Sequence, residues 1–247
     1  MLSKLCLHGL VLVLALAGSA DAGSRGEAAD LCERIIIEGG FVKSRGLLKY
    51  VTLLGPSFMT DVARLGPRGI WADMGAGRGD AVREYKNWGG RAGVMAASFE
   101  SLETLRLLGE VPEGMRILDG RFVEDIPPSE LGRADVITDV YGAMSYSSRI
   151  DKVLERYFRM LKPGGAIYLH SFEAHTVVTG PGGTNLFLRE WLQTLPGVHA
   201  ERTWRMVDFG ETIRLTLDGS EPFIPTLVLR EASEGWPPSR AFAEIGH

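Results

Sequence analysis

The hydrophobic pattern from residue 70 onward alternates between two kinds of segment. Short apolar runs typical of buried strands are followed by longer segments compatible with helices, and this alternation predicts a parallel sheet with helices on both faces. The paired prolines at 127 and 128 exclude regular structure at that point. The expected strands are residues 70–74, 91–96, 115–118, 134–140 and 166–170, and the expected helices are residues 79–87, 98–108 and 148–161.

The segments on either side of this alternation have different patterns. Before it, residues 43–54 and 57–65 predict two helical pieces separated by Gly55 and Pro56. A proline is well tolerated in a first helical turn, so Pro56 can open the second piece. Past residue 170 we expect a helix over 184–195, strands over 199–207, 211–217 and 224–229, and a loose tail from residue 231.

The N-terminus has the three-part pattern of a secretory signal peptide. Lys4 precedes an apolar run over residues 5–17, and Ala20 and Ala22 form an A-x-A cleavage site. The run is shorter than the roughly 20 apolar residues that a membrane-spanning helix needs. We therefore expect an exported chain, periplasmic or secreted, that is cleaved after Ala22 and has no membrane span. The alternatives are an uncleaved anchor or a wrongly assigned start codon, and a cytoplasmic protein.

Composition and charge narrow the class of protein. A chain of 247 residues suits one α/β domain. Its formal net charge of −4 argues against nucleic-acid binding through bulk charge. Cleavage after Ala22 would remove Cys6 and leave Cys32 alone, so we expect no intramolecular disulfide. We also expect no metal site, because no Cys/His cluster has the spacing of metal ligands.

The segment with the most chemical information follows the first expected strand and reads Asp73-Met74-Gly75-Ala76-Gly77-Arg78-Gly79. Glycines there let the backbone adopt positive φ and approach a ligand closely. In open α/β sheets, ligands lie outside the carboxyl ends of the strands. The third small residue of a dinucleotide fingerprint would fall on Asp80, and the Gly-Lys-Ser/Thr of a P-loop is absent. This spacing disfavours a nucleotide-binding oxidoreductase.

The pattern D-x-G-x-G-x-G resembles the first motif of class I S-adenosylmethionine-dependent methyltransferases. Two further landmarks follow in the family's order: a buried strand that ends at Asp139, and the LKPGG turn over residues 161–165. The resemblance covers residues 69–169. It implies a Rossmann-like, doubly wound, mostly parallel seven-stranded sheet with an antiparallel C-terminal hairpin and an N-terminal helical cap. The implied division is a signal peptide (1–22), a leader and cap (23–66), a methyltransferase-like domain (67–232) and a tail (233–247).

The resemblance implies S-adenosylmethionine as the cofactor and a binding site around the glycine loop. Asp73 would lie near the ammonium of the cofactor, where a carboxylate gives a charge-assisted hydrogen bond. Backbone N–H groups after Gly77 would suit the cofactor's carboxylate at the helix start. The loop residues expected to bind the cofactor are Gly75, Ala76, Gly77 and Gly79.

The second expected strand departs from the family pattern. The family places an acidic residue at its end to bind the ribose hydroxyls, and this chain has none at that place. Ser98 and Glu100 are the candidates to substitute for it. Glu100 has an equal alternative as an ordinary first-turn helix carboxylate, which the helix macrodipole favours.

The turns after the third and fourth strands supply the remaining candidates. Arg121 and Phe122 occupy the family's adenine-contacting turn, and Phe122 fits equally as a core residue. Asp139 and Tyr141 are expected to line the pocket, with a strand-end cap and an aromatic wall as their alternatives. The expected topology places His170 within reach of the reacting methyl group, and the alternative is a histidine of the core. No specific catalytic base is indicated.

The function that these observations favour is S-adenosylmethionine-dependent methyl transfer to a small-molecule or unidentified acceptor. The turn after the fourth strand is not Asn/Asp-Pro-Pro-Tyr, which argues against nucleic-acid bases as substrate. The alternative is an exported, non-catalytic methyltransferase-like binding module. The missing acidic residue favours that alternative, and so does export away from the cytoplasm, where we expect the cofactor to be made. The sequence does not indicate an oligomeric state.

Overall fold

The computed structural model describes residues 45–98, 111–171, 176–206, 210–230 and 240–244. The expected signal peptide, Cys32, Glu100 and nearly all of the helix expected over residues 98–108 lie outside these ranges and stay predictions. Within the described ranges, no helix has both the length and the apolar character needed to cross a membrane.

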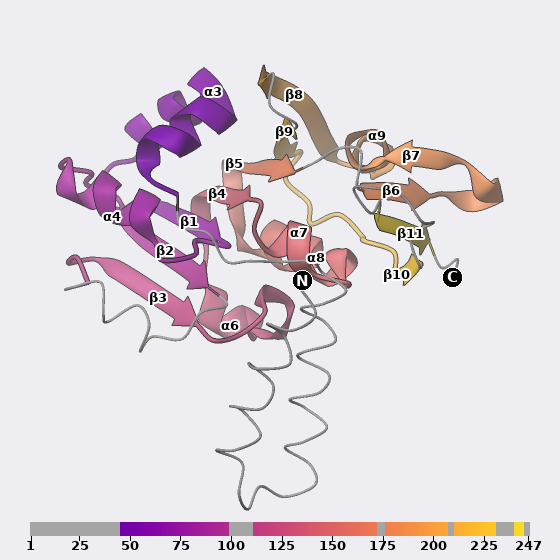
Figure 1. Ribbon diagram of the computed structural model, residues 1–247, viewed down its shortest axis with the longest axis horizontal. Helices are drawn as coiled ribbons and strands as arrows, with labels where there is room; N and C mark the ends of the chain where they lie inside the picture. The colour runs from indigo at the N-terminus through magenta and orange to yellow at the C-terminus, as the bar shows by residue number, and fades with distance from the viewer. Residues whose placement is uncertain (1–44, 99–110, 172–175, 207–209, 231–239, 245–247) are drawn as a thin grey trace, which may run out of the picture. The chain divides into compact units, whose positions relative to one another are not determined.

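Seven strands form the main sheet, in the order β3-β2-β1-β4-β5-β9-β8 (Figure 1). Strands β1 to β5 are parallel to one another, whereas β9 is antiparallel to both β5 and β8. This arrangement confirms the Rossmann-like fold with an antiparallel C-terminal hairpin. The strands are β1 (Ile70–Met74), β2 (Gly93–Ser98), β3 (Met115–Asp119), β4 (Ala134–Val140), β5 (Leu161–Ser171), β8 (Val198–Met206) and β9 (Gly210–Leu217).

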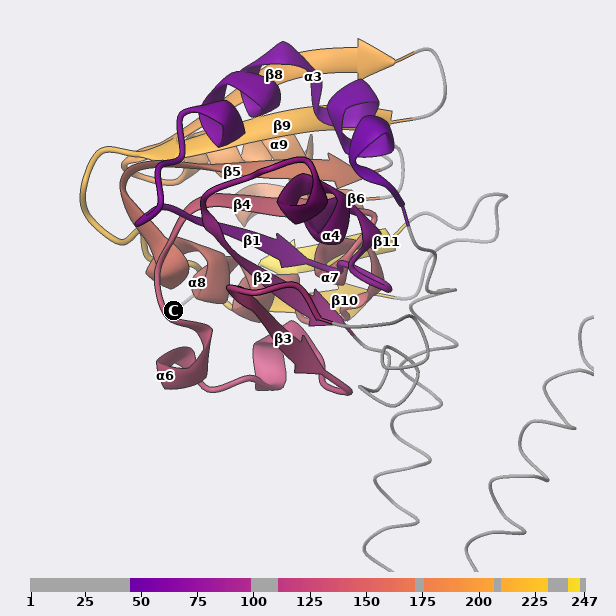
Figure 2. The ribbon, with the colours of Figure 1, turned by 90° about the vertical axis from the view of Figure 1, so that its left-hand side faces the viewer.

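Helices cover both faces of this sheet, as its continuously apolar strands require. Helices α3 (Leu47–Ala63) and α4 (Asp80–Asn87) pack on one face, which is turned toward the viewer in Figure 2. Helices α8 (Ile150–Met160) and α9 (Leu188–Thr194) pack on the other face. Successive residues of a strand point to opposite faces, so Trp71 contributes to the first cluster and Ala72 to the second.

The expected break between two N-terminal helical pieces is confirmed. Gly55 interrupts α3 with φ 80° and ψ −171°, and Pro56 opens the second piece. The left-handed φ is one that glycine adopts without steric cost. The break lets both halves of the helix follow the sheet, where Phe58 packs edge-to-face against Trp71 and Tyr168.

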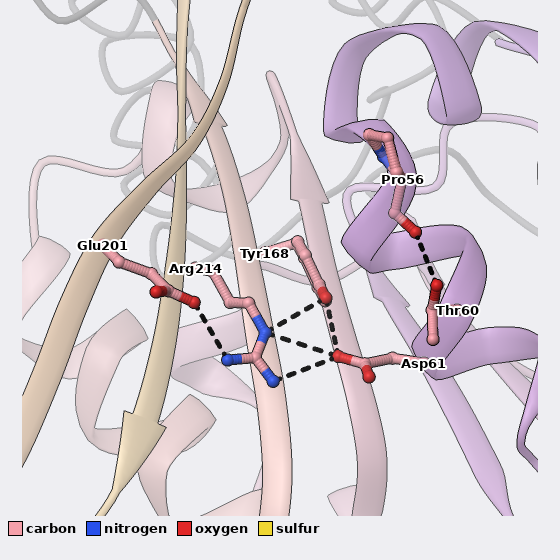
Figure 3. A network of polar contacts seen from close by, with 6 residues as sticks. All are labelled: Pro56, Thr60, Asp61, Tyr168, Glu201 and Arg214. Atoms are coloured by element: carbon pink, nitrogen blue, oxygen red, sulfur yellow. Dashed lines mark hydrogen bonds and ion pairs between the residues drawn. The ribbon is translucent and has the colours of Figure 1, made fainter.

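A polar network at the edge of this interface fixes the second half of α3 (Figure 3). The Tyr168 hydroxyl of β5 donates to Asp61 Oδ2 at 2.6 Å. Arg214 of β9 donates from Nη2 to the same oxygen at 3.2 Å and from Nη1 to Glu201 Oε1 of β8 at 3.0 Å. One helix is thereby tied to three neighbouring strands.

A second sheet of four strands follows the order β10-β11-β6-β7. It combines the segment after β5 with the C-terminal part of the chain, since β11 pairs in parallel with β6. Phe242 and Val178 of this sheet belong to the same buried cluster as α8 and α9. The strands are β6 (Thr176–Thr179), β7 (Asn185–Phe187), β10 (Leu227–Arg230) and β11 (Arg240–Glu244).

Several expectations from the sequence are wrong in detail. The paired prolines do not exclude regular structure: Pro128 opens the short helix α6 (Pro128–Leu131), where its missing N–H is not needed. The LKPGG segment is already part of β5 rather than a turn before it. The helix expected over 184–195 is divided between β7 and α9. The last expected strand, β10, joins the second sheet, where β11 also places part of the tail.

Candidate cofactor site

The loop between β1 and α4 has the backbone that its glycines predict. Gly75, Gly77 and Gly79 have φ of 116°, 55° and 74°. The backbone N–H groups of Gly75 and Ala76 both donate to the Ala97 carbonyl of β2, at 3.0 and 2.9 Å. Gly79 is the N-cap of α4. The loop therefore turns tightly at the carboxyl end of β1 and begins a helix, as an anion-binding helix start requires.

Two glycines bring this loop against the turn that follows β4. A Cβ atom on Gly75 would lie 2.2 Å from the Cα atom of Gly142, and one on Gly142 would lie 2.2 Å from the Met74 carbonyl oxygen. Both distances are far shorter than any van der Waals contact, so neither position has room for a larger residue. Strands β1 and β4 are neighbours in the sheet, and the strand order reverses between them. The chain continues from β1 to β2 and β3 on one side, and from β4 to β5 on the other side. Such a switch point is where open α/β sheets bind ligands.

Asp73 is fully buried under the glycine loop, on the face covered by α3. The Tyr50 hydroxyl lies 2.9 and 2.8 Å from its two carboxylate oxygens, and the Thr138 hydroxyl donates to Oδ1 at 2.9 Å. Burial raises the pKa of the Asp73 carboxyl to about 7, although the two hydroxyl donors oppose that rise. A carboxylate held in this way gains from a nearby cation, which would favour its ionised form.

Asp139 is also buried, on the opposite face of the sheet. Its carboxylate accepts the backbone N–H groups of Gly142 and Met144, each at 2.8 Å, and the Tyr157 hydroxyl at 2.5 Å. Burial raises the pKa of its carboxyl to about 6 against these three donors. Asp139 thus closes the turn after β4 and begins the short helix α7 (Ala143–Tyr146), which corresponds to the strand-end cap considered from the sequence.

Tyr141 occupies the turn between these groups in an unusual backbone conformation. Its φ of 47° is the only left-handed value of a non-glycine residue within the described ranges. Such a conformation costs on the order of 1 kcal/mol and persists where surrounding contacts fix it. The Tyr141 ring packs edge-to-face on His170 with centroids 4.7 Å apart, and its hydroxyl lies 2.9 Å from His170 Nε2.

His170 continues a chain of hydrogen bonds into the sheet. Its Nδ1 lies 2.8 Å from the Thr212 hydroxyl oxygen of β9, and that hydroxyl donates to the Leu53 carbonyl of α3 at 2.6 Å. Burial lowers the pKa of His170 to about 4, and the positive charges of Arg45 and Lys49 lower it further. The imidazole is therefore neutral at physiological pH.

Arg45 reaches the same place from the segment that precedes α3. Its guanidinium donates from Nη1 to the Val140 carbonyl at 3.2 Å and lies 5.1 Å from the centre of the Tyr141 ring. It also forms a side-chain hydrogen bond with Tyr146. The carboxyl ends of β4 and β5 thus carry a positive charge next to the two buried carboxylates.

The remaining expected residues lie farther along the same edge of the sheet. Ser98 is buried at the end of β2, beside Asp119 of β3 in the strand register. Arg121 is exposed and forms an ion pair with Glu130 at 2.8 Å, whereas Phe122 is half-buried. Within β2 itself there is no carboxylate, in agreement with the departure noted from the sequence.

Sequence reasoning missed Tyr50, Thr138, Arg45 and Thr212. Each contacts an expected site residue only because segments distant in the chain meet at the sheet, and no local motif marks these positions. Thr138 lies within the fourth expected strand, where its alternation with Val136 and Val140 could have placed it on one face. Within the described residues, no group of three or more metal-ligating side chains comes together.

The strand order decides the type of fold. The doubly wound order of β3 to β5 is followed by the antiparallel pair β9 and β8, as the resemblance to methyltransferases implied. The chain has a Rossmann-like, doubly wound fold with the strand order that the resemblance to class I methyltransferases implied. No known protein-family model and no curated protein matches the sequence, so the order of strands carries this conclusion.

Several solved structures resemble this fold at low sequence identity. A TehB-like S-adenosylmethionine-dependent methyltransferase from Corynebacterium glutamicum is 14% identical over 80% of this chain and 100% of its own, with a TM-score of 0.46. A candidate methyltransferase in complex with the Trm112 activator of Haloferax volcanii is 16% identical over 66% and 88%, with a TM-score of 0.44. The CMeT domain of the citrinin polyketide synthase is 14% identical over 62% of this chain and 47% of its own, with a TM-score of 0.44.

Proposed function

We propose that this protein is an S-adenosylmethionine-dependent methyltransferase that acts on a small-molecule acceptor. The observation that supports this most directly is the glycine loop at the switch point between β1 and β4, which lies directly above the buried carboxylate of Asp73. Perturbed titratable groups of this kind concentrate at functional sites.

The residues at this edge fit the chemistry of the cofactor. S-adenosylmethionine supplies an electrophilic methyl group on a positively charged sulfur. Gly75, Gly77 and Gly79 would allow its amino-acid part to approach the backbone, and Asp73 would offer a carboxylate near its positive charges. Ser98, at the end of β2, and Phe122, in the turn after β3, would contact its nucleoside part.

The acceptor would meet the side chains at the ends of β4 and β5. Tyr141, Tyr146 and Arg45 lie together there, and no proline-containing motif for nucleic-acid bases occurs in the turn. Methyl transfer depends chiefly on holding the two reactants in line. The fixed positions of Tyr141 and Arg45 are suited to that task.

Calorimetric titration with S-adenosylmethionine and S-adenosylhomocysteine, using the full chain and a Gly77→Arg variant, tests this proposal. We expect saturable binding by the wild type and loss of at least about tenfold in affinity in the variant, because an arginine would fill the loop and cannot adopt φ 55° without strain. The control is Gly89→Arg, which likewise replaces a glycine of positive φ but, unlike the buried Gly77, is exposed and lies beyond α4 with open space around it. Binding should survive in the control.

The same titration separates the proposal from its alternatives. No binding by a folded wild-type protein would refute a working cofactor site. Binding without methyl transfer to any acceptor in a broad screen would favour the non-catalytic binding module. Export of the mature chain after cleavage at Ala22 remains a separate proposal, and N-terminal sequencing of the protein recovered from cells would test it.

A further inference from the structure

The hydrogen bonds around His170 have a fixed direction. The Leu53 carbonyl can only accept, so the Thr212 hydroxyl uses its single proton to donate that hydrogen bond. The Thr212 oxygen must then accept from His170 Nδ1, 2.8 Å away. Because the imidazole is neutral, a proton on Nδ1 leaves Nε2 as a bare acceptor.

The direction of this chain determines what the Tyr141 hydroxyl can do. Since Nε2 of His170 carries no proton, the Tyr141 hydroxyl donates a hydrogen bond to Nε2, 2.9 Å away. Every further hydrogen bond at the Tyr141 oxygen is therefore one that this oxygen accepts. The left-handed φ of Tyr141 and the packing of its ring between His170 and Arg45 hold that oxygen in place.

We infer that Tyr141 selects the methyl acceptor, by accepting a hydrogen bond from the N–H of a neutral primary or secondary amine. This inference rests on the proposed methyltransferase function and assigns its substrate class. Donation of the N–H to Tyr141 turns the amine and its lone pair into one fixed orientation, which in-line transfer requires. A tertiary amine has no N–H to donate, so its complex would lack this hydrogen bond to the Tyr141 oxygen.

The surrounding charges favour an amine over a hydroxyl as the nucleophile. A hydroxyl must lose its proton to become a good nucleophile, whereas a neutral amine attacks through its lone pair. The N–C bond forms as the C–S bond of the sulfonium breaks, the neutral thioether S-adenosylhomocysteine leaves, and the methylated ammonium then releases a proton to water. His170 is too weakly basic to take that proton, because burial and the nearby Arg45 and Lys49 lower its pKa to about 4. His170 and Thr212 are accordingly positioning residues.

The inference is tested with aniline and N,N-dimethylaniline, which are both neutral near pH 7.5 and differ in the N–H group. Each is titrated calorimetrically into the full chain saturated with S-adenosylhomocysteine. We expect aniline to bind about threefold to tenfold more tightly, the range typical of one neutral hydrogen bond. In Tyr141→Phe, which keeps the ring but lacks the hydroxyl, this preference should disappear. Tyr85→Phe removes a hydroxyl outside the site, one that accepts the Ala92 backbone N–H, and should keep the preference.

A second measurement reports the direction of the chain without any acceptor. In ¹⁵N NMR spectra of histidine-labelled protein near neutral pH, with His170 assigned through His170→Asn, we expect a protonated Nδ1 and an unprotonated, hydrogen-bonded Nε2. Loss of the Tyr141 hydroxyl should shift the Nε2 resonance and leave Nδ1 protonated.

Three results would overturn the inference: equal binding of the two anilines, a preference that survives in Tyr141→Phe, or a proton on Nε2 of His170. They differ from failure of the proposed function, which the wild-type cofactor titration reports. If the cofactor product binds and the two anilines are not distinguished, the function stands and the role of Tyr141 is wrong. If it does not bind, both are refuted.

Discussion

Asp73 and Asp139 are buried carboxylates with raised pKa values, yet their partners give them different roles. Asp139 accepts two backbone N–H groups of its own turn besides the Tyr157 hydroxyl, so its carboxylate stabilises the backbone of that turn. Asp73 is held by the side-chain hydroxyls of Tyr50 and Thr138, which belong to other elements. Hydroxyl donors can reorient without moving the backbone, so Asp73 is the carboxylate better suited to respond to a bound cation.

The raised pKa of the Asp73 carboxyl predicts how the free energy of unfolding depends on pH. The folded protein holds a proton on Asp73 up to about pH 7, whereas an unfolded aspartate loses it near 3.8. Folded protein therefore binds more protons than unfolded chain between these values, and the contribution of Asp73 to the free energy of unfolding falls as pH rises through that window. A shift of about three units corresponds to at most roughly 4 kcal/mol.

Asp73→Asn removes this contribution, because an amide does not titrate. Urea unfolding between about pH 4 and pH 8 should show that the variant gains stability relative to wild type as pH rises. The affinity of the variant for the cofactor should be lower than that of wild type. His170 contributes with the opposite sign, since its lowered pKa makes stability rise with pH between about 4 and 6.5. That contribution is common to both proteins and cancels in their difference. A constant difference across the pH range would contradict the assignment.

At the scale of elements, the site depends on how closely the turns after β1 and β4 approach. Gly75 and Gly142 meet backbone to backbone, so two strand ends share a space in which a single methyl group does not fit. The first turn of α3 and the segment before it add a third element, since Tyr50 contacts Asp73 and Arg45 contacts the end of β4. The expected N-terminal cap is therefore part of the site as well as of the scaffold.

Gly142→Ala tests that approach. Its Cβ atom would lie 2.2 Å from the Met74 carbonyl oxygen and 2.8 Å from Asp139 Oδ1, and a backbone clash cannot be relieved by a change of rotamer. We expect a loss of about 3 kcal/mol in unfolding free energy, at the upper end of the usual range for overpacking. Gly66→Ala is the matched control, because nothing lies within 4 Å of its added Cβ. The control should be neutral or slightly stabilising, and equal stability of the two variants would contradict the close approach.

At the scale of the molecule, the two sheets share one buried cluster. Phe242 of β11 is fully buried in the same cluster as Tyr157 of α8 and Trp191 of α9. The C-terminal strands are thus tied to the main sheet through its helices and should unfold together with it. A common core of this kind predicts a single cooperative transition.

Phe242→Ala should therefore lower the unfolding free energy of the whole described domain by about 3–5 kcal/mol. Far-UV circular dichroism and tryptophan fluorescence are expected to report the same shifted transition in urea. Phe223→Ala is the control, because this phenylalanine is 62% exposed and its removal should change stability by less than about 0.5 kcal/mol. Two separated transitions in Phe242→Ala would show that the second sheet unfolds on its own.

Local rules predicted much of the candidate site's backbone. The positive φ values at Gly75, Gly77 and Gly79 follow from the absence of a Cβ atom, and the break at Gly55 follows from the same property. The side-chain partners were not predictable in the same way. The contact between Tyr50 and Asp73 joins residues 23 positions apart, and the one between Thr212 and Leu53 joins residues 159 positions apart.

The sequence by itself determined the alternation of strands and helices, the place of the glycine loop and the resemblance to methyltransferases, because hydrophobic period and glycine spacing are local properties of the chain. Only the tertiary structure decided which strand the last segments join, where the α3 side chains reach, and in which direction the hydrogen bonds around His170 run. Those features depend on burial and on contacts between distant segments. The direction in which a hydroxyl or an imidazole forms hydrogen bonds is fixed only when neighbours from elsewhere in the chain accept from its N–H or O–H group or donate to its lone pair.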